Sequence, residues 1–236
     1  MIFQLEPQLM LLLIFSLLFA LTFHEFAHAA IAYLCGDGTA KYLGRLTLNP
    51  LAHLDLFGSL MLLFAGFGYA KPVPVNPRNF RIRNADLYVS AAGPLSNLIL
   101  AGIGAWMLGM SFQGGWQTVW DFPLGELLVW FSLINMNLCL FNLLPIGPLD
   151  GSSVWPYFLP DAPRRKFMEF NDRYGTQVLM GLVMVSLALP GFSPFRWIGE
   201  ASRGLISWMV WTPLLIRYGV QSSHDYALVR FGLRSE

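Results

Sequence analysis

Long runs of apolar residues separated by short polar segments dominate the pattern along this chain. Between residues 9 and 35 the one formal charge is Glu25. A helix of 27 residues at about 1.5 Å each is roughly 40 Å long, which is enough to cross a hydrocarbon core of about 30 Å. Similar runs predict four more spans, at residues 87–112, 124–146, 176–195 and 204–220. We therefore expect an all-α polytopic membrane protein with about five to six transmembrane helices.

A sixth apolar run, residues 56–70, is about 15 residues long and contains Gly58, Gly66 and Gly68. It is short for a spanning helix and rich in helix-breaking residues. If it does not cross, most basic residues share one side: Lys41, Arg45, Lys71, Arg78, Arg81, Arg83, Arg164, Arg165, Lys166, Arg173, Arg230 and Arg234. By the positive-inside rule that side is the cytoplasm. We therefore expect residues 56–70 to form a short re-entrant or strand-like element at the membrane edge.

The composition agrees with a membrane protein. Hydrophobic residues make up 55% of the chain and charged residues 12%, and the mean hydropathy is +0.52, which argues against a water-facing surface. The net charge is +1 without a continuous basic stripe, so we expect no nucleic-acid partner. Cys35 and Cys139 stand in or beside apolar stretches and lack CxxC spacing, so we expect two buried free thiols.

The first predicted span carries a chemically distinctive cluster, His24-Glu25-Phe26-Ala27-His28. Histidines four residues apart project from one face of a helix, so both imidazoles can bind one zinc ion. Glu25 would then lie beside the metal and could take a proton from the activated water and pass it to a leaving amine. Ionisable residues inside an apolar span are costly without a function, which argues against a chance cluster. The cluster therefore predicts a zinc site for amide hydrolysis.

A catalytic zinc needs a third protein ligand and one open position. The residues after His28 lack the glycine and third histidine of a metzincin, so the candidate donors are His53, Asp55 and Asp150. Asp150 follows a long apolar span and lies at a membrane edge, although an aspartate in this context can also be an ordinary N-cap or turn residue. If residues 56–70 do not cross, Asp150 and the histidine pair lie at the same side. The metal site and the charge bias therefore select the same topology.

Four separated motifs resemble the site-2 protease family of intramembrane zinc metalloproteases (peptidase M50-like), in a compact form without a PDZ domain. The motifs are HEFAH at residues 24–28, NPLAHLDLFG at 49–58, GPLSN at 93–97 and NLLPIGPLDG at 142–151. The resemblance implies that His24, His28 and Asp150 are the zinc ligands and that Glu25 is the catalytic base. It also implies that His53 and Asp55 are structural.

Two asparagines belong to these motifs. The resemblance implies that Asn142 lies near the metal, where its amide could stabilise the tetrahedral oxyanion, and that Asn97 faces the site as a substrate contact or an outer-shell partner. For both residues the alternative is hydrogen bonding between helices. Residues 71–77, with alternating prolines, must be extended, and this segment either pairs with substrate by strand addition or is a plain connector.

The resemblance implies a zinc metalloendopeptidase with one Zn²⁺ per chain, which hydrolyses peptide bonds in or near transmembrane segments of membrane proteins, as in regulated intramembrane proteolysis. Its partners would be a transmembrane protein substrate and the lipid bilayer of a prokaryotic cell (inner) membrane, with the active site toward the cytoplasm. We expect one integral membrane domain, with a catalytic core at residues 1–151 and a C-terminal segment with two further spans at 152–236. The alternative is a membrane metal-ion transporter or metal-binding scaffold with the same His/Asp site, but transit does not require Glu25, and no inverted repeat is apparent.

Overall fold

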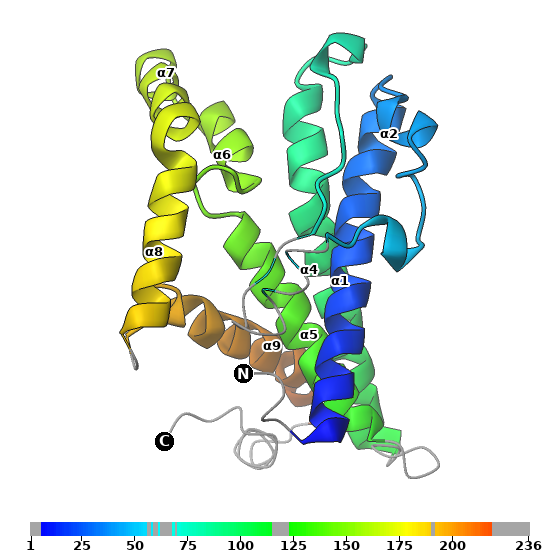
Figure 1. Ribbon diagram of the computed structural model, residues 1–236. Helices are drawn as coiled ribbons and strands as arrows, with labels where there is room; N and C mark the ends of the chain where they lie inside the picture. Colours follow the sequence, from blue (N-terminus) through cyan, green and yellow to red (C-terminus); the bar gives the residue numbers. More distant parts are fainter. Residues whose placement is uncertain are drawn as a thin grey trace.

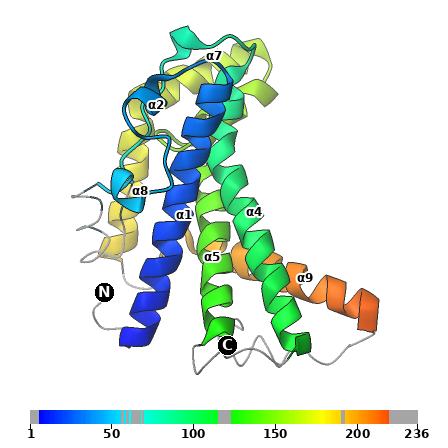
Figure 2. The same ribbon diagram turned by 90° about the vertical axis from the view of Figure 1, so that its right-hand side faces the viewer.

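Three long helices form the body of the protein. The computed structural model describes residues 6–55, 58, 61, 68, 70–114, 123–189 and 192–218. Helices α1 (Pro7–Leu34), α4 (Ala85–Gly114) and α5 (Leu124–Asn142) run side by side, with α4 antiparallel to the other two (Figures 1 and 2). Each is long and apolar enough to cross a membrane, which confirms three of the predicted spans. The described part of the chain is helical and contains no strand beyond one isolated bridge.

Shorter elements surround this body. They are α2 (Thr39–Tyr42), η2 (Pro50–Ala52), η3 (Pro77–Asn79), α6 (Gly151–Val154), η4 (Trp155–Phe158), α7 (Asp161–Phe170), the π-helix η5 (Asn171–Gly175), α8 (Thr176–Ala188) and α9 (Arg196–Tyr218). In Figure 1, α2, α6 and α7 lie at the upper end of the body, where α1 ends and α4 begins. Helix α8 descends along one side, and α9 crosses the lower half.

The two predicted C-terminal spans are not confirmed. Helix α8 begins at the predicted residue, Thr176, but has 13 residues and ends at Ala188, shortly before Pro190, which cannot donate a backbone hydrogen bond. Helix α9 begins at Arg196, which forms an ion pair with Glu200 at 2.9 Å, and the helix runs at a large angle to α1 (Figures 1 and 2). Among the described residues, only α1, α4 and α5 have the length and composition of a span. The division of the chain at residue 151 stays a prediction.

A glycine ends α1 and turns the chain away from the helix axis. Gly36 has a φ of 109°, a conformation that only glycine adopts readily. Its N–H donates to the carbonyl of Tyr33 at 3.0 Å, and the N–H of Asp37 donates to the carbonyl of Ala32 at 2.9 Å. These two bonds form a Schellman motif, which satisfies carbonyls that the helix end would leave free. The turn directs the chain to α2 and then toward the site.

Small residues let the long helices pack closely. Ala101 and Ala105 of α4 are fully buried in a cluster with α5 and α9. A Cβ atom on Gly104 would clash with the Ser132 hydroxyl, so this glycine allows α4 to approach α5. The other buried members of this cluster are Leu108, Leu128, Val129, Leu133, Met136, Ile206 and Val210. Cys35 and Cys139 are buried free thiols, as predicted.

The two ends of the segment 56–70 meet. Leu54 and Ala70 form an antiparallel bridge, and the N–H of Lys71 donates to the carbonyl of His53 at 2.9 Å. The chain therefore enters and leaves this segment at one place, as the predicted topology requires. The predicted re-entrant path itself lies largely outside the described residues.

Two buried charged side chains fix the segment that follows. Arg45 donates to the carbonyls of Lys71 and Pro72 at 2.6 and 3.2 Å. At the other end, the Asp37 carboxylate accepts hydrogen bonds from the N–H of Asn76 at 2.7 Å and from the Asn79 amide at 2.8 Å. Residues 71–76 contain no helix, as the prolines predict. The segment is thus held at both ends, and its middle lies over the buried part of α1.

We expect Asp37→Asn to lower the thermal stability of the purified protein at neutral pH. Burial raises the pKa of Asp37, but hydrogen bonds from Asn76, Thr39 and Asn79 outweigh it and lower the pKa to about 2. The ionised carboxylate therefore stabilises the folded state fully above the unfolded pKa of about 3.9, and this contribution is lost as the pH falls toward 2. The melting temperatures of wild type and variant should differ at pH 7 and converge progressively as the pH falls from about 4 toward 2. An equal difference at pH 7 and pH 3 would contradict this assignment.

Candidate metal centre

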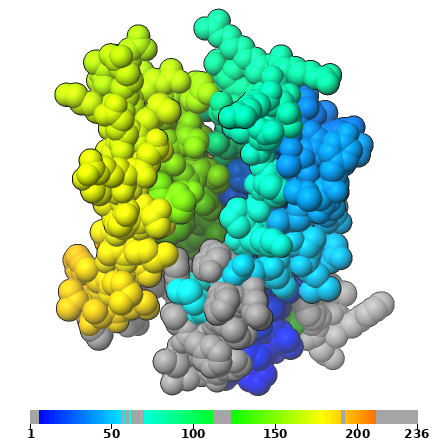
Figure 3. Space-filling view, turned by 45° about the horizontal axis from the view of Figure 1, so that its top comes forward, coloured from blue at the N-terminus to red at the C-terminus, as the bar shows by residue number. Residues whose placement is uncertain are grey.

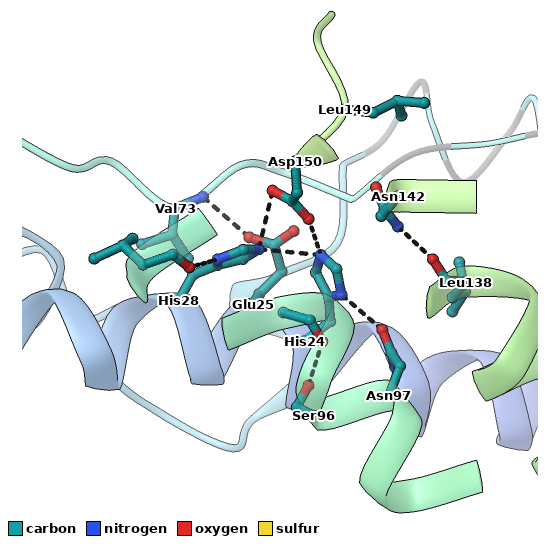
Figure 4. Close-up of polar contacts among 12 residues, drawn as sticks. His24, Glu25, His28, Val73, Ser96, Asn97, Leu138, Asn142, Leu149 and Asp150 are labelled. Carbon is teal, nitrogen blue, oxygen red and sulfur yellow. Dashed lines mark hydrogen bonds and ion pairs between the residues drawn. The ribbon is translucent and has the colours of Figure 1, made fainter. Parts of the chain in front are cut away.

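The structure brings His24, His28 and Asp150 together, although Asp150 is far from the histidines in sequence. The two imidazole Nε2 atoms are 3.1 Å apart. Asp150 Oδ2 lies 3.2 Å from Nε2 of His24, and Oδ1 lies 3.4 Å from Nε2 of His28 (Figure 4). Both histidines are buried, and their Nε2 atoms and a carboxylate oxygen lie within 4.8 Å of one another. In the part of the chain that the structure describes, this is the one such group.

Hydrogen bonds orient the His24 ring. Its Nδ1 lies 2.6 Å from Oδ1 of Asn97 on α4. The Asn97 amide nitrogen donates to the carbonyl of Ala20 at 3.0 Å and to Oδ1 of Asn135 at 2.9 Å, which leaves its oxygen facing His24. An amide oxygen can only accept, so Nδ1 of His24 carries the proton. The Nε2 atom of His24 therefore faces His28 and Asp150.

The His28 ring is fixed in the same way. Its Nδ1 lies 2.7 Å from the carbonyl oxygen of Val89 on α4, which again requires a proton on Nδ1. With both Nδ1 atoms bonded to oxygen acceptors, the two Nε2 atoms are directed toward each other and toward Asp150. Such an outer hydrogen bond is the usual arrangement of metal-binding histidines.

These donors fit a zinc ion. Asp150 Oδ2 is buried and has no hydrogen-bond donor. Two imidazole nitrogens and a carboxylate thus converge on one place, where a bound cation would compensate the charge of the carboxylate. Two nitrogens and one oxygen are a common donor set for catalytic zinc, with the fourth position open.

Gly93 of α4 lies directly against the two imidazoles. A Cβ atom on this residue would lie 2.6 Å from Nε2 of His24 and even closer to Nε2 of His28. Real Cβ atoms essentially never approach so closely. Glycine therefore lets α4 pass the Nε2 edge of the two rings without displacing them. This gives a physical role to the first residue of the GPLSN motif.

Glu25 lies between the histidines and is also buried. Its Oε2 accepts a hydrogen bond from the backbone N–H of Val73 at 3.0 Å. Figure 4 shows its carboxylate beside the imidazoles and pointing toward Asp150. Val73 belongs to the extended segment that Arg45 and Asp37 hold, so the folded chain supplies a fixed donor to Glu25.

Asp150 begins the short helix α6 but does not cap it with its side chain. The Asp150 carbonyl accepts from the N–H groups of Ser153 and Val154 at 2.9 and 3.1 Å, whereas the carboxylate makes no capping hydrogen bond. The ordinary N-cap alternative is therefore not what the structure shows. The carboxylate is free to face the histidines.

Asn142, the last residue of α5, lies in the same cleft but directs its donor elsewhere. Its Nδ2 donates to the carbonyl of Leu138, one turn back on α5, at 3.0 Å. Figure 4 shows the amide nitrogen pointing away from Asp150. The oxyanion role of Asn142 stays a prediction, and it requires the amide to leave Leu138.

The rival donors His53 and Asp55 do not join the cluster. His53 is buried, and its Nε2 lies 2.8 Å from the carbonyl of Thr47. The Asp55 carboxylate accepts from the N–H of Gly58 at 2.9 Å. Both contacts are local and match the structural roles expected for this segment.

A cleft of about 530 Å³ leads to His24, His28 and Asp150. Its walls come from α1, the segment after Ala70, the start of α4, the end of α5 and α8. Figure 3 shows a hollow between the yellow and green C-terminal elements and the cyan segment, with blue α1 atoms inside it. A peptide could approach the histidines along this path.

Several contacts of the site were not predicted from the sequence. The sequence does contain a signal for Asn135, which, like Asn97, is an amide residue inside an apolar span. The carbonyl of Val89 and the N–H of Val73 are backbone groups, so the residue types at these positions give no indication of the contacts. Gly93 stood in a recognised motif, but its role depends on how closely two helices pack.

Comparisons with known proteins identify the family. A family model described as Peptidase family M50 matches residues 112–186, which include Asp150. "Putative zinc metalloprotease YwhC" of Bacillus subtilis is 42% identical over 211 residues, which cover 88% of this chain and 95% of the relative. Rip2 of Mycolicibacterium smegmatis, described in the same words, is 29% identical over 164 residues, or 65% of this chain and 60% of the relative. No solved structure matches.

The similarity to YwhC extends over nearly the whole chain, and the donor set suits the metal that its name gives. The chain therefore belongs to peptidase family M50, the site-2 protease family, and is an integral membrane zinc metalloprotease.

Proposed function

We propose that this metalloprotease cleaves peptide bonds in or near transmembrane segments of other membrane proteins, with His24, His28 and Asp150 as zinc ligands and Glu25 as catalytic base. The proposed setting is a prokaryotic cell membrane, with the active site toward the cytoplasm.

The depth of the histidines within α1 carries this proposal. Leu34 ends the helix ten residues after His24 and six after His28. At about 1.5 Å per residue, the two imidazoles lie roughly 15 and 9 Å from the helix end. A helix of 28 residues exceeds a hydrocarbon core of about 30 Å by some 6 Å at either end, so both ligands fall within the depth of the core. A substrate that reaches them must itself enter the membrane.

The proposed orientation rests on charge. Lys41 belongs to α2, which follows the upper end of α1, and Arg164 and Arg165 belong to α7 at the same end (Figure 1). Basic loops mark the cytoplasmic side. The hollow in Figure 3 is seen obliquely from the side of this end, so we infer that water reaches the site from the cytoplasm.

Each group of the proposed site has a distinct role in peptide hydrolysis. Zinc, when bound, polarises the scissile carbonyl and acidifies a water molecule. Glu25 accepts the proton of the attacking water and returns it to the leaving amine, while Val73 N–H holds its Oε2 in place. The Asn142 amide would donate to the developing oxyanion after it turns from Leu138. A helical substrate must be locally unwound, because its carbonyls are otherwise bonded within the helix.

Reconstitution tests the proposal. The full chain in proteoliposomes is mixed with a single-span substrate, and cleavage sites are mapped by mass spectrometry. We expect cuts in or next to the apolar segment, and none with a Glu25→Gln enzyme. Cuts restricted to a water-soluble domain of the substrate would overturn the intramembrane assignment.

A further inference from the structure

The loop that carries Asp150 is held from outside by the chain between α7 and α8. Oδ1 of Asn171 accepts a hydrogen bond from the N–H of Gly147 at 2.6 Å. Asn171 is a buried polar side chain, and its Nδ2 donates to the carbonyl of Phe167 at 3.1 Å. This second bond fixes the amide orientation, so that the oxygen must face Gly147. Gly147 precedes Asp150 by three residues.

A second contact, from Gly175, also involves Gly147. A Cβ atom on Gly175 would lie 2.9 Å from the Cα and N atoms of Gly147 and 3.0 Å from its carbonyl oxygen. These are backbone atoms, which cannot move aside as a flexible side chain can. Gly175 therefore has to be glycine for the α7–α8 connection to pack against the loop. Asn171 and Gly175 together fix the position of Gly147.

Both residues belong to η5, the π-helical turn Asn171–Gly175. Single π turns widen a helix and occur often at functional sites and kinks. Figures 1 and 2 show that the chain bends at this turn, since α7 and α8 run in different directions on either side of it. In Figure 1 the green loop after α5 reaches toward the yellow helix before it enters α6.

We propose that Asn171 and Gly175 are positioning residues for the zinc site, which hold Gly147 so that the Asp150 carboxylate lies between His24 and His28. The proposal rests on the role of Asp150 as a zinc ligand. Two residues, Pro148 and Leu149, separate the held glycine from the ligand, and the proline ring stiffens this short link.

This arrangement couples the C-terminal helices to the metal. Leu179 and Met180 of α8 line the same cleft as Asp150. Helix α8 begins directly after Gly175, so a displacement of α8 by a substrate or partner would pull on Gly147. Loss of the contact would move the one ligand that does not come from α1.

Zinc affinity of the purified full-length protein, measured by competition with a chromophoric chelator, tests the proposal. Asn171→Leu removes the acceptor while keeping a branched side chain with the same number of heavy atoms, whereas Asn171→Asp keeps the acceptor. Gly175→Ala has a matched control in Gly181→Ala on α8, where an added Cβ meets nothing within 4 Å. We expect Asn171→Leu and Gly175→Ala to weaken zinc binding about 10- to 100-fold, the usual effect of losing an outer-shell partner. Asn171→Asp should retain most of the affinity, and Gly181→Ala should bind as wild type does.

The same variants in an Asp150→Ala background separate the two proposals. If Asn171 acts through Asp150, Asn171→Leu should cause no further loss of affinity there. Wild-type affinity in Asp150→Ala would refute the ligand assignment itself. Reduced affinity in Asp150→Ala with wild-type affinity in Asn171→Leu and Gly175→Ala would overturn the positioning role alone. An equal loss from Asn171→Leu in both backgrounds would also overturn it, because the effect would then not pass through Asp150.

Discussion

Glu25→Gln is expected to abolish cleavage while the protein keeps about one zinc ion per chain. Glutamine has nearly the same shape as glutamate, and its amide oxygen can still accept the N–H of Val73, so the fold around α1 should be preserved. It cannot take up a proton near neutral pH. General acid–base catalysis contributes roughly 10²- to 10⁴-fold, so we expect kcat to fall by about 10³-fold with a small change in KM.

Glu126→Gln is the matched control for this experiment. Glu126 lies in the first turn of α5, where it accepts a hydrogen bond from Gln8 at the start of α1, far from the metal-facing atoms. We expect wild-type cleavage from this variant. Normal zinc content and unchanged cleavage in Glu25→Gln would remove Glu25 from the mechanism.

Gly93→Ala is expected to weaken zinc binding by more than about 100-fold, beyond the loss that outer-shell changes usually cause. The new methyl group would occupy the space at the Nε2 atoms of His24 and His28. The clash cannot be relieved by a small shift, because α4 is packed against α1 and carries Pro94 at the next position. The imidazoles would have to turn away from the metal, which also breaks the hydrogen bond of His24 to Asn97.

Gly102→Ala on the same helix separates this steric effect from a general effect on α4. An added Cβ at Gly102 meets nothing within 4 Å. Alanine is favoured over glycine in a helix by about 1 kcal/mol, so this variant should be at least as stable as wild type and bind zinc normally. Equal zinc affinity in Gly93→Ala and Gly102→Ala would show that Gly93 does not limit the metal site.

Helices that are apolar along their whole length could be predicted from composition. Where the composition changes along a helix, the observed helix differs from the predicted one. Helices α1, α4 and α5 agree with the predicted runs within a few residues at most ends. Helix α5 stops at Asn142, four residues before the predicted end, and Pro145 follows in the loop. Helix α9 starts eight residues before the predicted span, because its first two turns contain the charged residues Arg196, Glu200 and Arg203, which a hydropathy window leaves out.

The proximity of His24, His28 and Asp150 could be predicted, because it depends on residue spacing and on topology. The interval from His24 to His28 puts both rings on one helix face, and the alternation of α1, α4 and α5 puts Asp150 at their level. The supporting contacts could not be predicted in this way. The fit of Gly93 against the imidazoles and of Gly175 against Gly147 depends on tertiary packing at the scale of a single methyl group.

The zinc affinity of Asp150→Ala, compared with that of Asp55→Ala, is the most direct test of Asp150 as the third zinc ligand. Both variants remove an aspartate that the sequence offered as the third donor, but only Asp150 lies at the Nε2 atoms of the histidines. We predict a loss of more than about 100-fold for Asp150→Ala, since it removes a ligand, and near wild-type affinity for Asp55→Ala. Tight zinc binding by Asp150→Ala, together with its loss in Asp55→Ala, would contradict the assignment of the metal centre.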